Sequence, residues 1–204
     1  AWQGAVFGLG DLDRTMARRV FNPGGLVAVW AEENTRESIF AALKRREVYA
    51  TSGPRISVRL SANIQDENMS CAADEKSSAI IDMGGDFNKV LGIPTFKIHA
   101  QADEMPLQEM ELIKGQYKNG KYEEAVLTVW QRSNKGSDIC QIWQDKNFEP
   151  TAPAFWYARI KQAPTPRWSA NLCRKAGRCD EYSGADIMIQ ERAWTSPIWY
   201  LPEH

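Results

Sequence analysis

The chain has few histidines: its 204 residues include only His99 and the terminal His204. Metal centres of hydrolases are built largely from histidine and carboxylate ligands, and structural zinc sites from paired cysteines and histidines. Neither a His-x-His pair nor a Cys-x-x-Cys pair occurs in the sequence. We therefore expect this chain to contain no metal site, no cofactor and no catalytic residue of its own.

The chain also lacks an excess of positive charge, with 25 Lys and Arg against 26 Asp and Glu. Proteins that neutralise nucleic-acid phosphates need a basic stripe, and none is present. No apolar run approaches the ~20 residues needed to span a bilayer. Nucleic acid and membrane are thus not expected partners. The sequence starts at Ala1 without an initiator Met or a signal-peptide pattern, so we expect the native start to lie upstream.

Four cysteines are present, an even number that is compatible with disulfides but does not require them. Four cysteines permit three pairings, and free thiols remain an alternative. Cys173 and Cys179 are separated by a short loop and are the best candidates for a bridge. The other two are Cys71 and Cys140.

Residues 25–47 have the pattern of a strand, a loop and a helix. The apolar run 25–30 follows a turn and predicts a buried strand. Asn34 with Glu37 three residues later forms a capping box, which predicts the start of a helix. That helix is expected to end near Glu47, before the β-prone residues 48–51.

From Pro54 onward the apolar residues alternate with polar ones, as in half-buried strands. Asn119-Gly120 lies between two such runs and predicts a hairpin. The pattern favours a mainly β fold, an antiparallel β-sandwich preceded by a short strand–loop–helix α/β remnant. The expected strands centre on residues 56–60, 79–81, 96–100, 110–112, 125–130, 155–160 and 196–200.

Two domains are predicted, with a boundary near residue 53. Residues 1–53 would be the terminal strand–loop–helix unit of a truncated α/β barrel domain, and residues 54–204 the sandwich. The reason is that about fifty residues offer too few strands to bury Val27, Val29 and Trp30.

Several stretches of the chain resemble the bacterial family called domain of unknown function 3604. The longest are 25–37, AALKRREVYATSGPRI at 41–56 and IQERAWTSPIWY at 189–200. Shorter ones are residues 83–86, 112–115 and 164–169. That family is related to the carbaryl-hydrolase-like metallohydrolases of the polymerase-and-histidinol-phosphatase superfamily.

The resemblance implies an upstream barrel that binds divalent metal ions through a His-x-His and an Asp-x-His motif, both absent here. This chain would then be a non-catalytic carboxy-terminal accessory domain of a metal-dependent hydrolase of phosphoesterase or esterase type. It would brace the barrel, its partner in the same protein, and shape the substrate cleft. Contacts between copies in a homo-oligomer remain open. Export to the periplasm or the extracellular space is also implied, and the four cysteines suit it.

Five polar residues are candidates for lining such a cleft. Glu32, Glu33 and Asn34 follow a predicted strand, where α/β barrels carry their catalytic groups. The alternative is that Asn34 caps the helix and the two glutamates are solvated. Arg36 and Arg55 could bind an anionic substrate group, or form ion pairs within the fold.

A second set of candidates precedes the final aromatic segment. Gln190, Glu191, Arg192 and Trp194 could form a hydrogen-bonded domain interface or line a cleft, and the interface is the preferred interpretation.

A different class of function also fits the composition: a carbohydrate- or ligand-binding β-sandwich. Sugar rings stack on exposed aromatic faces, and the sequence offers many tryptophans. Burial of all of them would exclude this hypothesis. An enzyme complete in itself is a third alternative. The tryptophans considered are Trp130, Trp143, Trp156, Trp168 and Trp199.

Overall fold

The computed structural model describes residues 24–65, 69–72, 80–90, 92–131, 136–177, 179 and 187–203. The larger sheet contains β1 (Leu26–Val29), β2 (Val48–Thr51), β5 (Asp86–Phe87), β7 (Leu107–Lys118), β8 (Lys121–Gln131), β10 (Ala154–Gln162), β13 (Arg192–Thr195) and β14 (Ile198–Tyr200). The smaller sheet contains β3 (Ser57–Asn63), β4 (Ile80–Asp82), β6 (Thr95–Gln101) and β9 (Asp138–Gln144). The helices are α2 (Arg36–Arg45) and α3 (Trp168–Ala176), and β11 (Thr165–Pro166) pairs with β12 (Met188–Ile189).

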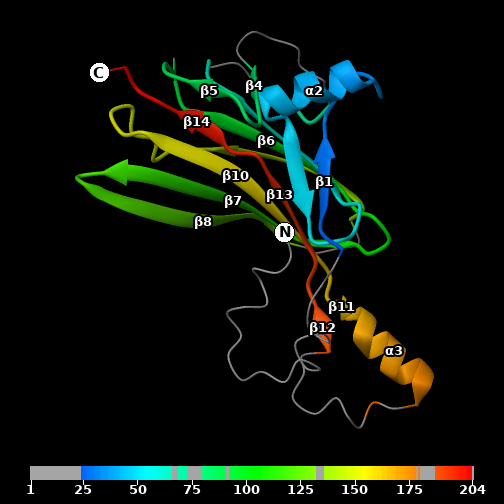
Figure 1. Cartoon of the computed structure of the whole chain (residues 1–204). Coiled ribbons are helices and arrows are strands. Elements are labelled where there is room, and N and C mark those ends of the chain that lie inside the picture. The colour runs from blue at the N-terminus through cyan, green and yellow to red at the C-terminus, as the bar shows by residue number, and fades with distance from the viewer. Residues whose placement is uncertain are drawn as a thin grey trace.

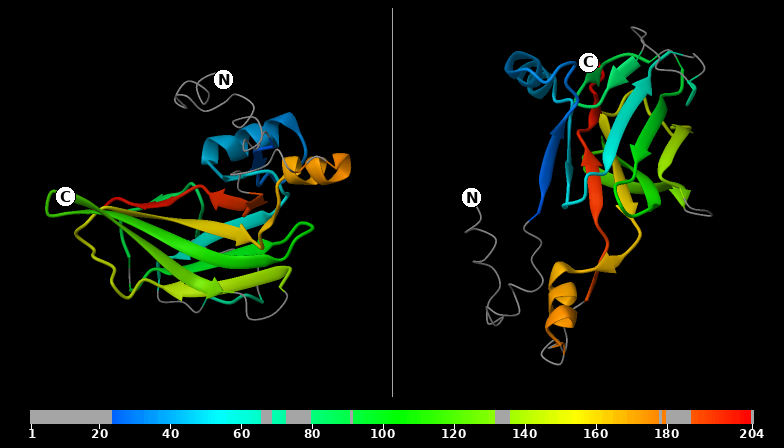
Figure 2. Two further views of the ribbon diagram at one scale, coloured as in Figure 1. Left: turned by 90° about the horizontal axis from the view of Figure 1, so that it is seen from below. Right: turned by 90° about the vertical axis from the view of Figure 1, so that its right-hand side faces the viewer.

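The larger sheet is built around the long strand β10. β7 pairs along one edge of β10, and β13 and β14 pair with successive parts of its other edge. β8 continues the sheet beyond β7, and β2 and β1 continue it beyond β13. All these pairs are antiparallel, whereas β14 and β5 run parallel. Figures 1 and 2 show α2 near one end of the sheet and α3 beside β11 and β12 at the other.

A hydrophobic core joins the two sheets. Leu60 on β3 and Phe96 on β6 are fully buried, and so are Leu112 on β7 and Trp156 on β10. Leu60 and Trp156 alternate along their strands with more exposed residues, as expected for a sheet with one face on a core, whereas both neighbours of Leu112 on β7 are buried as well. The predicted mainly β fold with antiparallel packing is therefore confirmed.

The predicted hairpin at Asn119-Gly120 is also confirmed. These two residues join β7 to β8 with φ of 50° and 76°. Positive φ at both central residues matches the turn that suits the right-handed twist of a two-stranded ribbon. The expected strand near residues 79–81 is β4, except that residue 79 lies outside the described part of the chain.

The predicted ends of the first helix were wrong by one or two residues. Thr35, not Asn34, is the N-cap, and its hydroxyl accepts a hydrogen bond from the Ser38 amide. Glu37 is then one residue too early to complete a capping box. The helix ends at Arg45 rather than near Glu47, because Arg46 adopts the left-handed conformation with φ of 63°.

The strand–loop–helix unit joins the larger sheet. β1 pairs antiparallel with β2, and β2 pairs antiparallel with β13. β1 thus forms one edge of the sheet among the described residues. The domain boundary near residue 53 stays a prediction.

Two disulfides are present. Cys173–Cys179 is the bridge expected from the short loop, and Cys71–Cys140 is the second. The alternative of free thiols is therefore wrong for all four cysteines. Neither described helix is long and apolar enough to cross a membrane.

Candidate functional site on the outer face of the larger sheet

The side of the larger sheet that points away from the core is called here the outer face. On β10, Trp156, Ala158 and Ile160 are buried in the core. Because side chains alternate along a strand, the intervening residues belong to the outer face. They are Phe155, Tyr157, Arg159 and Lys161.

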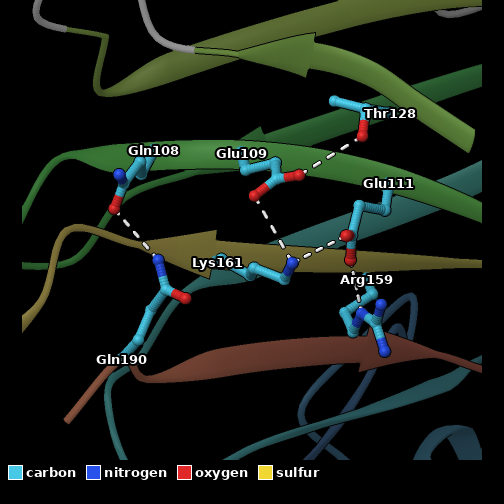
Figure 3. Close-up of polar contacts among 7 residues, drawn as sticks. All are labelled: Gln108, Glu109, Glu111, Thr128, Arg159, Lys161 and Gln190. Carbon is cyan, nitrogen blue, oxygen red and sulfur yellow. Dashed lines mark hydrogen bonds and ion pairs between the residues drawn. The ribbon is translucent and has the colours of Figure 1, made fainter.

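A ladder of four charged residues crosses this face between β7 and β10 (Figure 3). The strand register places Arg159 opposite Glu111 and Lys161 opposite Glu109. The Lys161 Nζ atom lies 2.6 Å from Glu111 Oε1 and 3.4 Å from Glu109 Oε2. The Arg159 Nε–H group donates a hydrogen bond to Glu111 Oε2. Two cations thus neutralise two carboxylates, an arrangement typical of stabilising cross-strand pairs.

Glu111 is the most buried member of the charge ladder, with only 5% of its side chain exposed. Burial by itself raises the pKa of the Glu111 carboxyl, but hydrogen bonds from Arg159 and Lys161 lower it by more. The pKa of Glu111 is therefore below the ordinary glutamate value. Glu111 stays ionised although it lies almost out of solvent.

We expect Glu111→Gln to destabilise the protein by about 1–3 kcal/mol near pH 7, since charge-assisted hydrogen bonds are lost. A pKa lowered by folding contributes stability that is present above the unfolded-state pKa, about 4.3, and lost as the pH falls through the folded-state value. The difference in the free energy of unfolding between wild type and Glu111→Gln should therefore shrink as the pH is lowered. Urea unfolding from pH 7 down to acidic pH measures this difference. Glu104→Gln, at an exposed carboxylate, is the matched control; a difference independent of pH would contradict the prediction.

Two further polar contacts lie near the charge ladder (Figure 3). Thr128 Oγ1 on β8 donates to Glu109 Oε1 at 3.3 Å. Gln190 Nε2 donates to Gln108 Oε1 at 2.9 Å, which links the segment before β13 to β7. The ladder with Thr128 therefore ties β8, β7 and β10 together, and the Gln190–Gln108 contact is separate from it.

The four interface candidates lie together where β13 meets β2 and β10. Glu191 accepts a hydrogen bond from the Ser52 hydroxyl, and the Arg192 amide donates to Ser52 Oγ at 2.8 Å. Trp194 lies opposite Arg159 in the β10–β13 register. Glu191 and Arg192 thus contribute to a network that connects residues before and after the predicted domain boundary.

A row of aromatic side chains occupies the other half of the outer face. The rings of Tyr122 and Phe155 are 6.4 Å apart and inclined by 16°, and those of Phe155 and Tyr157 are 6.4 Å apart and inclined by 17°. Trp199 packs against Phe155 at 5.0 Å. We call Tyr122, Phe155, Tyr157 and Trp199 the aromatic row.

The five tryptophans considered from the sequence have different environments. Trp156 is fully buried, and Trp130 and Trp143 pack partly buried against the core. Trp168 on α3 is 46% exposed, and Trp199 on β14 is 36% exposed. Of these five tryptophans, Trp199 is therefore the one that forms part of an exposed aromatic surface on a sheet.

The five cleft candidates do not all come together. Glu32, Glu33 and Asn34 are exposed between β1 and α2, and Arg36 is exposed in the first turn of α2. Arg55 follows β2 at its far end, because Val29 pairs with Val48 and Leu26 with Thr51. The Arg55 amide donates to Asp103 Oδ2 at 2.8 Å. A functional role for these five residues stays a prediction.

A shallow hollow of about 360 Å³ lies beside the end of α2. Residues 45–47 and 80–86 line it, so it contains none of the five cleft candidates. Arg46 and Asp86 already form an ion pair at 3.3 Å there.

The candidates predicted from the sequence include none of the four residues of the charge ladder, and only Trp199 of the aromatic row. A signal was present: the residues that alternate with the buried positions of β10 are two aromatics and two cations. Within the described residues, no group of three or more His, Cys, Asp or Glu side chains is placed to hold a metal ion. Glu109 and Glu111 are paired with Lys161 and Arg159, which makes them poor cation ligands.

Fold and site together define an antiparallel β-sandwich with a charged and aromatic outer face. The family described as "Protein of unknown function (DUF3604)" matches residues 7–138 and 129–202, so the chain belongs to this family. Searches of curated proteins and of solved structures gave no match.

Proposed function

We propose that the chain is a non-catalytic accessory domain of a larger metal-dependent hydrolase of phosphoesterase or esterase type. The parent protein would be related to the carbaryl-hydrolase-like enzymes of the polymerase-and-histidinol-phosphatase superfamily. Its upstream barrel would hold the divalent metal ions. The domain described here would brace that barrel and shape the cleft, and the protein would be exported. Two disulfides support an oxidising location.

One observation carries the bracing role: four exposed apolar residues lie on the adjoining elements β1 and α2. Val27 is 74% exposed and Leu26 42%, while Phe40 is 57% and Leu43 46% exposed. Apolar residues that gather on one part of a surface are typical of interaction sites, whereas scattered ones are not. Among the described residues β1 is also an edge strand, and a further strand could pair with its outward backbone groups.

The experiment uses the protein from the complete reading frame, including its upstream domain. We expect it to bind divalent metal and to hydrolyse nitrophenyl esters or phosphoesters. Val27→Glu would place a charge in the proposed contact and lower the unfolding temperature of the upstream domain by about 5 °C, since 1 kcal/mol corresponds to about 2–4 °C for domains of this size. Metal analysis, turnover and calorimetry measure these effects.

Ile142→Glu is the matched control, because Ile142 is an exposed apolar residue on β9 of the smaller sheet. It should leave the upstream domain unchanged. Two results would refute the proposal: a full-length protein without metal and turnover, or equal effects of the two substitutions.

A further inference from the structure

We propose that the aromatic row is a binding site for a neutral oligosaccharide laid across β8, β7, β10 and β14. This inference does not depend on a hydrolase parent, since it concerns side chains of this chain alone. Three observations support it: a repeated ring orientation, a fixed position for the central ring, and hydrogen-bonding groups at the margin of the rings.

Three rings of the aromatic row, those of Tyr122, Phe155 and Tyr157, share one orientation, and the ring of Trp199 is tilted by 49° to that of Phe155. The two ring pairs Tyr122–Phe155 and Phe155–Tyr157 have the same 6.4 Å spacing and nearly the same small inclination. Tyr122 is 56% exposed and Trp199 36% exposed, so the two ends of the row are accessible. A regular series of similarly oriented rings suits a ligand that is itself a series of similar rings, such as an oligosaccharide.

The central ring, that of Phe155, is held in place over a glycine of the neighbouring strand. Phe155 lies opposite Gly115 on β7, and a Cβ atom on Gly115 would stand 2.3 Å from Phe155 Cζ. The Phe155 ring therefore lies over Gly115, in the space that any other side chain would fill. Trp199 supports Phe155 from the other side. A platform ordered before binding loses less entropy when the ligand arrives.

Hydrogen-bonding groups stand at the margin of the rings. Glu124, on the β8 position opposite Gly115, accepts a hydrogen bond from the Tyr122 hydroxyl at 2.8 Å. Glu124 is exposed and retains acceptor capacity, and the Tyr122 hydroxyl oxygen can accept. Sugars have an apolar C–H face and a rim of hydroxyl groups. The aromatic ring faces can stack on the C–H face, and the Glu124 carboxylate beside them can accept hydrogen bonds from the hydroxyl groups.

The charges of the face favour a neutral ligand over a nucleic acid. Nucleobases also stack on aromatic rings, but their phosphates require cations along the groove. Arg159 and Lys161 are already paired with Glu111 and Glu109. The carboxylate nearest the accessible ring of Tyr122 would repel phosphate.

The test uses the whole chain. Affinity electrophoresis in gels containing soluble β-glucan, xylan, mannan or α-glucan selects a class, and calorimetry with the corresponding hexasaccharide measures the affinity. We expect retardation by at least one polysaccharide. Tyr122→Ala and Trp199→Ala should each weaken binding about tenfold or more, and Trp168→Ala, which alters an exposed tryptophan on α3, should not change it.

Gly115→Ala gives an independent test, because it displaces the Phe155 ring without removing an aromatic group. It should weaken binding about as much as Trp199→Ala. Unfolding temperature and near-ultraviolet dichroism confirm that each variant is folded. Either of two results would overturn the proposal: no retardation by any polysaccharide, or an affinity for oligo-dT equal to that for the hexasaccharides.

Discussion

Replacing Asp145 by Ala is expected to lower the free energy of unfolding by about 3–5 kcal/mol, because it leaves a buried cation unpaired. Asp145 is 2% exposed, and its carboxylate lies 2.6 Å from the Lys114 Nζ atom, whose side chain is 8% exposed. The same carboxylate accepts hydrogen bonds from the Trp156 indole and the Asn147 amide, both at 3.2 Å. Three donors therefore lose this acceptor at once, and Lys114 Nζ keeps a hydrogen bond to the Asn147 carbonyl at 3.2 Å but no carboxylate.

Denaturant unfolding of Asp145→Ala measures this effect. The double variant Lys114→Met, Asp145→Ala should be more stable than Asp145→Ala alone, since no unpaired charge is then buried. Lys89→Ala, which breaks an exposed ion pair with Glu203, should have little effect. A loss for Asp145→Ala no larger than that for Lys89→Ala would show that the buried pair does not form.

The Cys71–Cys140 bridge is expected to contribute about 4 kcal/mol to stability and the Cys173–Cys179 bridge about 2 kcal/mol. The two differ in loop length, since the bridged cysteines are 69 and 6 residues apart in sequence. A cross-link removes more conformational freedom from the unfolded chain when the loop it closes is longer. Pairwise replacement by Ala, followed by denaturant unfolding, measures both contributions.

Mass spectrometry of unreduced peptides provides the control for this prediction. It should find both pairs and no exchanged pair. Equal losses of stability for the two double replacements would contradict the loop-length argument, and a Cys71 paired with Cys173 or Cys179 would contradict the bridge assignment itself.

The strands of the sandwich could be predicted because their signal is local. On β3 and β6 the buried residues alternate with partly or fully exposed ones, and Asn119-Gly120 has the turn chemistry of a hairpin. The helix start was harder to place. Asn34 and Thr35 are both good caps, and only the backbone geometry, extended at Thr35, decides between them.

The sequence also missed α3 and β9. α3 has no side-chain cap at its start and few buried residues, although Gly177 at its end and the basic residues of its last turn are usual signs of a helix C-terminus. β9 contains only partly buried and exposed residues, and its alternation is weak. Its position is set by pairing with β6 over its full length, which is a tertiary contact.

On strands with clear alternation, such as β3 and β6, the sequence by itself determined which side chains point to the core and which point away. It also determined that few histidines are available and that Cys173 and Cys179 are close enough to bridge. Only the tertiary structure decided which outward-pointing residues are neighbours. Arg159 meets Glu111 across 48 positions of sequence, and Phe155 lies over Gly115, because β10 pairs with β7 in one particular register. A shift of one residue in the register of β10 would move its charged and aromatic side chains to the core face. It would also move the buried Trp156 and Ile160 out of the core, which forbids the shift.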